Sequence, residues 1–146
     1  MKIQYMSDLH LEFYDYDLPR VPAKAGDVLV LAGDIHVGTN AIPWIERCTH
    51  VFDKVFYVPG NHEFYGKTMH KVRENLVKSV EGYDSTFDPI PNVTILDNTH
   101  EKYEGVNFIG TTLWSEASTY CNFTINDFKR ITYKYRNGYG KFKAQE

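Results

Sequence analysis

The sequence predicts a single α/β domain in which helices pack against a β-sheet. Apolar runs of strand length alternate with amphipathic segments of helix length, in the order strand, strand, helix, strand, helix, strand, strand. An apolar content of 42% and an aromatic content of 15% are typical of a chain that folds around a core, and 146 residues suit one domain. We therefore expect residues 1–146 to form one domain.

Apolar runs predict five strands, at residues 3–6, 27–32, 54–58, 93–96 and 106–110. The run at 27–32 is continuously apolar, which is typical of a strand buried on both faces of a parallel sheet. Pro59 and Gly60 end the third run. A polar turn at residues 98–105 is expected to join the last two strands.

Two segments have the periodicity of amphipathic helices. In residues 41–52, Ile42, Ile45 and Cys48 fall roughly on one face. In residues 65–80 the apolar side chains recur at i, i+3, i+7, i+8 and i+11, namely Met69, Val72, Leu76, Val77 and Val80. These patterns predict helices that pack against the sheet.

The rest of the chain has a weaker pattern. Residues 12–26 and 82–92 contain prolines and are expected to be loops. A short helix is predicted at residues 124–131, with Thr124 or Asn126 as its cap. The basic, glycine-containing tail from residue 134 onward is expected to be weakly ordered.

Charge and cysteine content limit the possible partners and compartments. The net charge of -3 gives no electrostatic basis for non-specific binding to nucleic acid or anionic membranes, so a nucleic acid is expected only as a substrate. Two cysteines are too few for a disulfide framework or a thiolate zinc site. The sequence has no apolar run of signal-peptide or membrane-spanning length. We therefore expect a reduced, cytoplasmic protein that does not bind membranes.

Three short motifs each follow a predicted strand and place metal-capable side chains just beyond its end. Asp8 and His10 follow the first strand, Asp34 follows the second, and Asn61 and His62 follow the third. In α/β sheets, ligands gather at the carboxyl ends of the strands. Two carboxylates, an amide oxygen and two imidazoles suit a divalent-metal site that carries out hydrolysis.

Each motif also has a purely structural interpretation. Asp8 and His10 could form a capped turn with a surface histidine, and Asp34 could cap the next helix. Asn61 could cap the helix predicted at 65–80. The order of the motifs, one after each of three strands, favours the metal site over three separate caps.

With these motifs the chain resembles the calcineurin-like metallophosphoesterase family, and in particular its small bacterial and phage-type members. The similar stretches also include residues 5–12, 58–65 and 108–114, and the resemblance covers essentially the whole chain. It implies an α/β fold in which a β-sandwich is flanked by helices. It also implies two divalent metal ions at the strand ends, and mixed oxygen and imidazole ligands fit manganese, iron, zinc or magnesium.

The resemblance also implies a role for each motif residue. Asp8 and His10 would bind the first metal ion, Asp34 would bridge both, and Asn61 would bind the second. His62 would contact the scissile phosphate and help to protonate the leaving oxygen, so that His62 and Asp34 are the expected catalytic residues. A metal-bound hydroxide would attack a phosphodiester or small phosphomonoester in line.

The chain departs from the family pattern in its second half. Family members continue with a Gly-His or Thr-His element and a Gly-His-x-His element, whose imidazoles complete the metal site, and neither follows here. His36 is the nearest substitute, with an exposed loop histidine as its alternative interpretation. The other histidines are expected on helix surfaces or in a turn, namely His50, His70 and His100. The second metal position then keeps only Asp34 and Asn61, so that one bound ion is a possible outcome.

A second departure concerns the substrate. Protein Ser/Thr phosphatases of this superfamily carry an arginine shortly after the Gly-Asp motif, and residues 33–40 contain none. This disfavours a phosphoprotein substrate. Several aromatic side chains near the strand ends could stack on a base or sugar, with ordinary packing as the favoured alternative: Phe13, Tyr14, Phe64, Tyr65 and Trp114.

Three accounts fit a C-terminally truncated, partial domain of this family. The chain could be a natural truncation that no longer catalyses and acts as a binding or interaction module. It could be completed by a second polypeptide or by self-association. It could also be a fragment of a longer product. In each case we expect an open sheet edge and an exposed apolar face.

Overall fold

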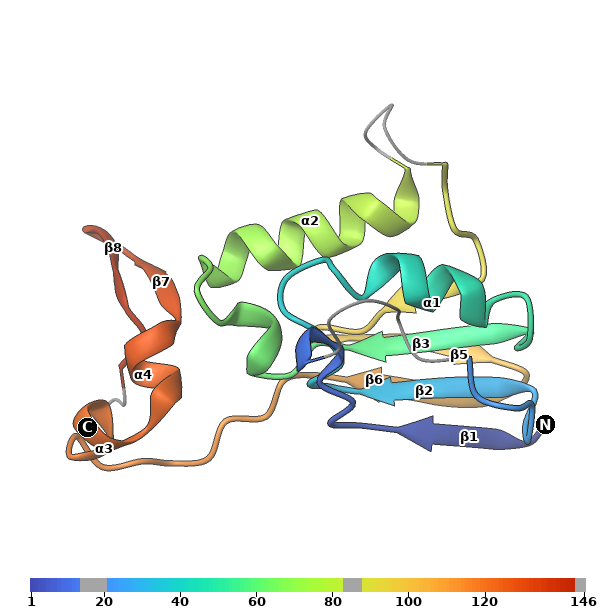
Figure 1. Cartoon of the computed structure of the whole chain (residues 1–146), viewed down its shortest axis with the longest axis horizontal. Helices are drawn as coiled ribbons and strands as arrows, with labels where there is room; N and C mark the ends of the chain where they lie inside the picture. The colour runs from blue at the N-terminus through green and yellow to red at the C-terminus, as the bar shows by residue number, and fades with distance from the viewer. Residues whose placement is uncertain (14–20, 83–87, 144–146) are drawn as a thin grey trace.

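A four-stranded parallel sheet forms the centre of the fold. The computed structural model describes residues 1–13, 21–82 and 88–143. The sheet contains β1 (Ile3–Met6), β2 (Val28–Ala32), β3 (Lys54–Val58) and β4 (Val93–Ile95), in that spatial order. Each neighbouring pair is parallel, so that the carboxyl ends of all the strands lie on one side of the molecule (Figure 1).

Two helices cover one face of this sheet. They are α1 (Ile42–Cys48) and α2 (Met69–Glu81), which lie together above the strands in Figure 1. Their apolar faces bury Trp44, Ile45 and Leu76 against sheet residues such as Leu29 and Tyr57, and all of these are at most 1% exposed. The sequence periodicity predicts this packing, in which the apolar face of each helix is buried against strands that are covered on both faces.

An antiparallel hairpin packs on the opposite face of the sheet. It consists of β5 (Thr99–Tyr103) and β6 (Val106–Gly110). The Phe108 ring stacks on Phe56 of β3 at 4.2 Å between centroids. The ammonium of Lys54, whose side chain is nearly buried, lies 2.9 Å from the Glu101 carboxylate. The hairpin and the parallel sheet therefore form two stacked β-layers.

The C-terminal segment lies beside the sheet at the carboxyl ends of its strands (Figure 1). It contains two short helices and a second antiparallel hairpin, namely α3 (Cys121–Thr124), α4 (Asn126–Arg130), β7 (Thr132–Tyr135) and β8 (Gly138–Lys141). Ile131 is fully buried in the main core, and Thr68 pairs with Thr132 in an isolated bridge. These contacts join the segment to the start of α2.

The α/β class with helices flanking a sheet is confirmed, and the differences lie in particular elements. The predicted polar turn at 98–105 is wrong, because residues 99–103 form a strand and only Glu104 and Gly105 turn, both with positive φ. The tail from residue 134 is not weakly ordered up to Lys141, because β7 and β8 pair as an antiparallel hairpin in which Tyr133 and Tyr135 lie opposite Gly140 and Gly138.

The helix predictions are corrected at their ends. The first helix ends at Cys48 and not at residue 52. The second starts at Met69, because residues 62–64 form a separate 3-10 turn, η2 (His62–Phe64). The helix predicted at 124–131 is two helices separated by Ile125, which has an extended backbone, and neither Thr124 nor Asn126 is the cap.

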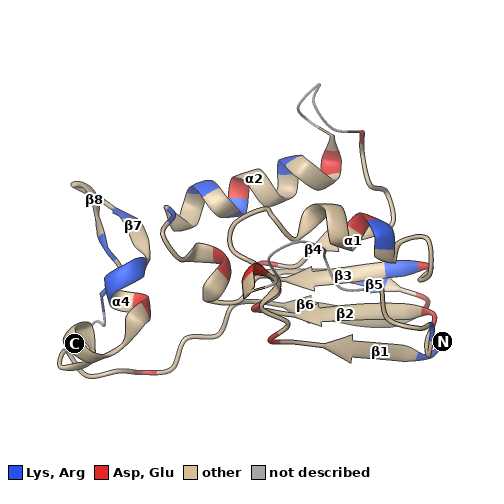
Figure 2. Ribbon diagram, viewed as in Figure 1, with Lys and Arg blue, Asp and Glu red and all other residues tan. Residues whose placement is uncertain are grey.

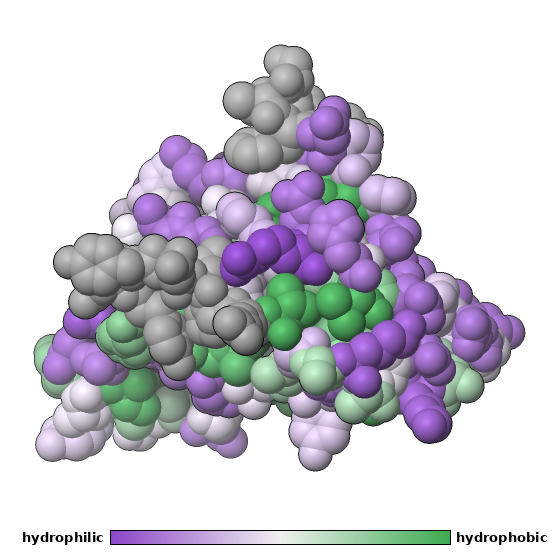
Figure 3. All heavy atoms as spheres, turned by 45° about the vertical axis from the view of Figure 1, so that its right-hand side comes forward, coloured by the Kyte–Doolittle hydropathy of each residue, from purple (hydrophilic) through white to green (hydrophobic). Residues whose placement is uncertain are grey.

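Several apolar side chains are exposed on different elements. Tyr5 on the edge strand β1 is 80% exposed, Ile109 of the hairpin 79% and Leu113 86%. Figure 3 shows one face of the molecule on which hydrophobic residues gather in a patch bordered by hydrophilic ones. In the described part of the chain, no helix combines the length and the apolar character needed to cross a membrane.

Candidate metal centre

Three loops meet at the carboxyl ends of β1, β2 and β3. The backbone N–H of Asp8 donates to the Gly33 carbonyl at 3.0 Å, and the N–H of His10 donates to the Asp34 carbonyl at 3.0 Å. The backbone N–H of His62 donates to the Asp34 carboxylate at 3.0 Å. These bonds place the three motifs side by side, and acidic residues gather at these strand ends in Figure 2.

The backbone at this edge is strained. Asp8, His10 and Asp34 have φ of 54°, 47° and 55°, and they are three of the five described non-glycine residues with positive φ. Such a backbone costs about 1–3 kcal/mol per residue and is concentrated at functional sites. Because the three strained residues are the expected metal ligands, the strain supports a functional interpretation of this edge over three unrelated turns.

Two glycines allow the second and third loops to approach closely. Gly33 has a φ of +91°, and a Cβ atom there would lie 2.9 Å from the Gly60 Cα. A Cβ on Gly60 would lie 2.5 Å from the backbone nitrogen of Asp34 and would collide with its carboxylate. Side chains at either position would therefore push Asp34 away from the third loop.

The buried carboxylate of Glu63 links the same two loops. Its carboxylate is fully buried and accepts hydrogen bonds from the Tyr57 hydroxyl and from four backbone N–H groups, those of Asp34, Ile35, His36 and Gly60. Burial raises the pKa of Glu63, and the hydrogen bonds from Tyr57 and the Ile35 N–H oppose that rise. The sequence motifs assign no role to Glu63, although its position directly after Asn61 and His62 is a usable signal.

The side chains of Asp8, His10 and Asp34 converge. Candidate ligand atoms from these three residues all lie within 4.8 Å of one another. Two carboxylates and an imidazole at this separation fit a divalent cation that prefers oxygen and nitrogen ligands. The geometry thus brings together all three residues that the sequence analysis placed on the first metal ion.

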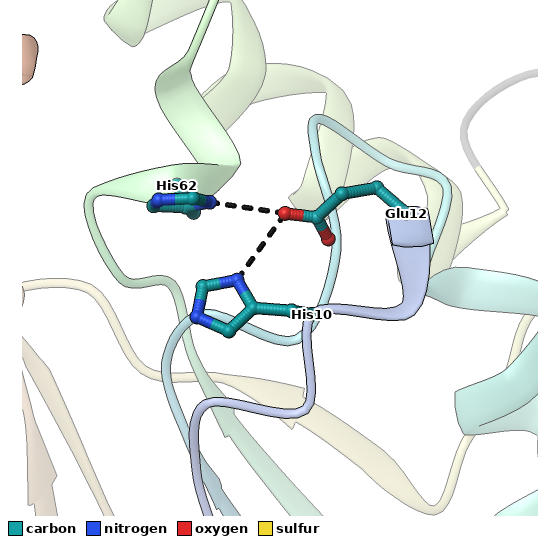
Figure 4. Close-up of side chains that lie close together, drawn as sticks. All are labelled: His10, Glu12 and His62. Carbon is teal, nitrogen blue, oxygen red and sulfur yellow. Dashed lines mark hydrogen bonds and ion pairs between the residues drawn. The ribbon is translucent and has the colours of Figure 1, made fainter. Parts of the chain in front are cut away.

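Glu12 and His62 form a second group with His10. The Glu12 Oε1 atom lies 3.2 Å from His10 Nδ1 and 3.0 Å from His62 Nδ1 (Figure 4). Burial alone would raise the pKa of Glu12, but the hydrogen bonds with His62 and His10 hold it below its ordinary value. Sequence reasoning missed Glu12, which lies two residues after His10, just as His10 lies two residues after Asp8.

Asn61 faces the C-terminal segment. Its Nδ2 donates to the Asp127 carboxylate at 2.8 Å, and the Tyr65 hydroxyl donates to the same oxygen at 2.5 Å. The amide nitrogen of Asn61 is thus engaged with Asp127. Asp127 had no sequence signal, since it lies 66 residues beyond Asn61.

A cavity of about 590 Å³ opens beside these residues. Its polar wall includes Asp8, Asp34, Asn61 and Asp127, and its apolar wall includes Ile109, Leu113 and Trp114. A site of this size with a few convergent polar groups is typical of small-molecule binding.

The other histidines lie elsewhere. His36 Nδ1 accepts the backbone N–H of Val37 at 2.7 Å, and His36 belongs to neither group of candidate ligands found among the described residues. It therefore does not replace a missing imidazole here. His50 lies in an exposed turn after α1, and His70 lies on α2. His100 is part of β5 and not of a turn.

Most of the aromatic residues considered for base stacking are used in packing. Phe64 is fully buried, the Trp114 ring packs on Phe142 at 4.6 Å between centroids, and the Tyr65 hydroxyl is bonded to Asp127. Phe13 is 73% exposed and lies beside the His10 ring. Tyr14 lies outside the described residues. The packing alternative therefore holds for Phe64.

Together, the parallel sheet and the loops at its carboxyl edge define a class of protein: an α/β domain with a candidate divalent-metal centre at the strand ends. The chain belongs to the calcineurin-like phosphoesterase family, whose family model matches residues 1–142. This confirms the family resemblance that the motifs carry.

The chain is also similar to two individual proteins, one of which is described as a metallophosphoesterase. The chain is 30% identical over 152 residues to an uncharacterized protein of Acanthamoeba polyphaga mimivirus, covering 88% of this chain and 51% of that protein. It is 29% identical over 123 residues to an uncharacterized metallophosphoesterase of Helicobacter pylori, covering 75% of this chain and 29% of that protein. The chain therefore spans about half the length, or less, of these relatives.

Proposed function

We propose that this chain is a metal-dependent phosphoesterase whose substrate is a phosphodiester or a small phosphomonoester. The observation that carries the proposal is the convergence of Asp8, His10 and Asp34 on three strained backbone positions beside an open cavity. Family membership supplies the general reaction, hydrolysis of a phosphoric ester with divalent cations.

In this proposal Asp8, His10 and Asp34 hold one cation, and Asp34 with Asn61 contributes to a second. The chemistry that a divalent cation supplies at such a site is the activation of water and the neutralisation of phosphoryl charge. The Asp34 carboxylate is held in place by the His62 N–H, and its backbone is held by Glu63. Manganese is the first ion to test, and the oxygen and imidazole donors fit iron, zinc and magnesium as well.

His62 has the role of proton donor to the leaving oxygen. Its ring lies against His10 at 4.4 Å between centroids and is bonded through Nδ1 to Glu12, so that Nε2 is the atom free to face a substrate. The ring is one-fifth exposed and lines a smaller cavity together with Phe13 and Arg130. This position is compatible with general acid catalysis, which requires a donor within hydrogen-bond reach of the substrate.

We infer the substrate class from what surrounds Asp34. Ile35 is buried in the core, and His36 and Val37 occupy the following positions, so this loop supplies no guanidinium to clamp a phosphate. A phosphoester substrate that relies on the cations for charge neutralisation fits this arrangement. We propose a nucleic acid only as such a substrate. We also propose a cytoplasmic location.

The test is hydrolysis of an aryl phosphodiester by the purified chain with and without manganese, beside Asp34→Asn. We expect manganese-dependent turnover that falls by more than about 100-fold in the variant, beyond the loss typical of an outer-shell partner. Asp53→Asn is the matched control, because Asp53 is exposed and lies just before the other end of β3. Equal turnover in both variants would contradict the proposal.

A second candidate function rests on the exposed apolar side chains of Ile109 and Leu113, which line the same cavity. The chain would then be an interaction module, completed by a second copy of itself or by another polypeptide. This candidate would be favoured over the enzyme if the folded protein shows no turnover and one of two further results is obtained. Its mass in solution would be twice that of one chain, or it would bind a partner through these residues.

A further inference from the structure

One carboxylate oxygen joins two histidines that come from different loops. Glu12 Oε1 lies 3.2 Å from His10 Nδ1 and 3.0 Å from His62 Nδ1, and the second contact spans 50 residues of sequence. Figure 4 shows both rings turned with one nitrogen toward Glu12 and the other away from it. The sequence motifs assign work to both histidines and none to the residue between them.

The chemistry of the three groups fixes which ring nitrogen carries a proton. An ionised carboxylate only accepts hydrogen bonds, so each Nδ1 must be the donor. In a neutral ring with Nδ1–H, the lone pair is on Nε2. Glu12 therefore presents the Nε2 lone pair of His10 to a cation. When His62 acts as the acid, its ring carries a second proton on Nε2, and the Glu12 contact at Nδ1 leaves Nε2 as the atom that gives this proton to a leaving oxygen.

The fold holds Glu12 firmly in this place. It lies in the 3-10 turn η1 (Leu11–Phe13), whose Leu11 is 2% exposed and donates its N–H to the Ile35 carbonyl at 2.8 Å. The other carboxylate oxygen, Oε2, is buried and has no hydrogen-bond partner in the described part of the chain. A buried unpaired oxygen is costly, so stability alone gives no reason to keep a carboxylate here.

We propose that Glu12 is a positioning residue that sets the Nδ1–H form and the ring orientation of both His10 and His62. Metal-binding histidines commonly donate their second ring N–H to a carboxylate, which orients the ring and raises its basicity. Here one carboxylate serves two rings with different tasks. The two tasks, metal binding by His10 and proton transfer by His62, rest on the proposed phosphoesterase function. The position of the proton on each ring does not depend on that function.

The Glu12–His10 contact (the His10 arm) and the Glu12–His62 contact (the His62 arm) give separable effects in Glu12→Gln. Loss of the His10 arm lowers manganese affinity by about 10–100-fold, the usual effect of removing such a partner. Loss of the His62 arm lowers kcat at saturating manganese. In a His62→Ala background, Glu12→Gln should still weaken manganese binding but should lower kcat no further. A purely structural role would instead give additive losses of kcat.

The closing experiment is nitrogen-15 NMR of the histidine rings in the metal-free full chain, at a pH where free histidine is neutral. The wild type, Glu12→Gln and the control Glu74→Gln are compared, with peaks assigned by His10→Ala and His62→Ala. Glu74 is an exposed helix residue paired only with Lys78 among the described contacts. Manganese titration by calorimetry follows on the same samples.

We expect Nδ1–H in both rings of the wild type and of Glu74→Gln, and a shift toward Nε2–H in Glu12→Gln. Nε2–H on either ring of the wild type would overturn the proposal without the need for any variant to fold. Unchanged rings and unchanged manganese affinity in folded Glu12→Leu, which removes the acceptor oxygen that glutamine would keep, would overturn it as well. Wild-type Nδ1–H rings in a chain without turnover would contradict the phosphoesterase function alone.

Discussion

The parallel-sheet region and the C-terminal segment are built in different ways. Between residues 11 and 96 the chain buries a large apolar core, with the side chains of β2, β3, α1 and α2 almost completely covered. From residue 111 onward only Phe128 and Ile131 are buried among the described residues, and side chains such as Leu113 and Phe123 are largely exposed. The first region therefore supplies most of the hydrophobic stabilisation.

What the C-terminal segment contacts is informative. The Thr111 hydroxyl donates to Asn98 Oδ1, and the other hydrogen bonds described between this segment and the rest of the chain go to the third site loop and the residues just after it. Asp127 accepts from Asn61, the Gly66 N–H donates to the Arg130 carbonyl at 3.0 Å, and the Thr112 hydroxyl donates to the Pro59 carbonyl at 2.6 Å. A weakly buried segment that contacts this loop contributes to the site more than to the core.

Hydrogen exchange should reveal the largest difference between the two regions. Amides of β2 and β3 should exchange only through near-global unfolding, whereas those of the β7–β8 hairpin should exchange through local opening. We expect the protection factors to differ by about 10,000-fold or more, which corresponds to the stability of a typical domain. Similar protection in both regions would show that the C-terminal segment is part of the same cooperative unit.

The two cysteines report the same contrast in a second way. Cys48 lies in the main core, where burial raises the pKa of its thiol to about 12, and Cys121 is half-buried in the C-terminal segment. A thiol reagent attacks the thiolate, so Cys121 in the native protein should react about 1,000-fold faster than Cys48. Mass spectrometry of each labelled peptide measures both rates, and equal rates would contradict the described core.

A pair of alanine substitutions compares core and surface directly. Leu76 is fully buried on α2, so Leu76→Ala should lower the free energy of unfolding by about 2–5 kcal/mol. Ile109 is 79% exposed, so Ile109→Ala should change it by less than about 0.5 kcal/mol. Urea denaturation of the two variants checks the difference. A large loss from Ile109→Ala would mean that this face is covered in solution.

A smaller effect than that of Leu76→Ala is expected at Glu63, which belongs to the first region and supports the site. Glu63→Gln turns an acceptor oxygen into an NH₂ donor facing N–H groups, and we expect a loss of about 1–3 kcal/mol of stability. Chemical denaturation measures this loss. Glu81→Gln, at the end of α2, is a control that should have little effect. A neutral Glu63→Gln would contradict the clamp between the two loops.

The sequence predicted the first region well because its signals are local. The continuous apolar run at 27–32 indicates a buried strand, and the glycines at 33 and 60 indicate sharp turns where strands end. The observed bounds of β3 match the predicted ones. The three motif residues that converge, Asp8, His10 and Asp34, were all named from their positions after strands.

The rest depended on contacts between distant parts of the chain. Thr99–Tyr103 is polar and gave no strand signal, yet it pairs with β6 and its Glu101 binds Lys54. Asp127 reaches Asn61 only because α4 docks beside the third loop. Glu12 meets His62 across two loops. No short-range pattern contains these pairings.

The most direct test of the central claim, that the loops after β1, β2 and β3 form a divalent-metal centre, is calorimetric titration of the metal-free chain with manganese. We predict binding by the wild type, loss of at least one binding event in Asp34→Asn, and no change in Asp53→Asn. Absence of manganese binding by the folded wild type, or equal binding by both variants, would contradict the account.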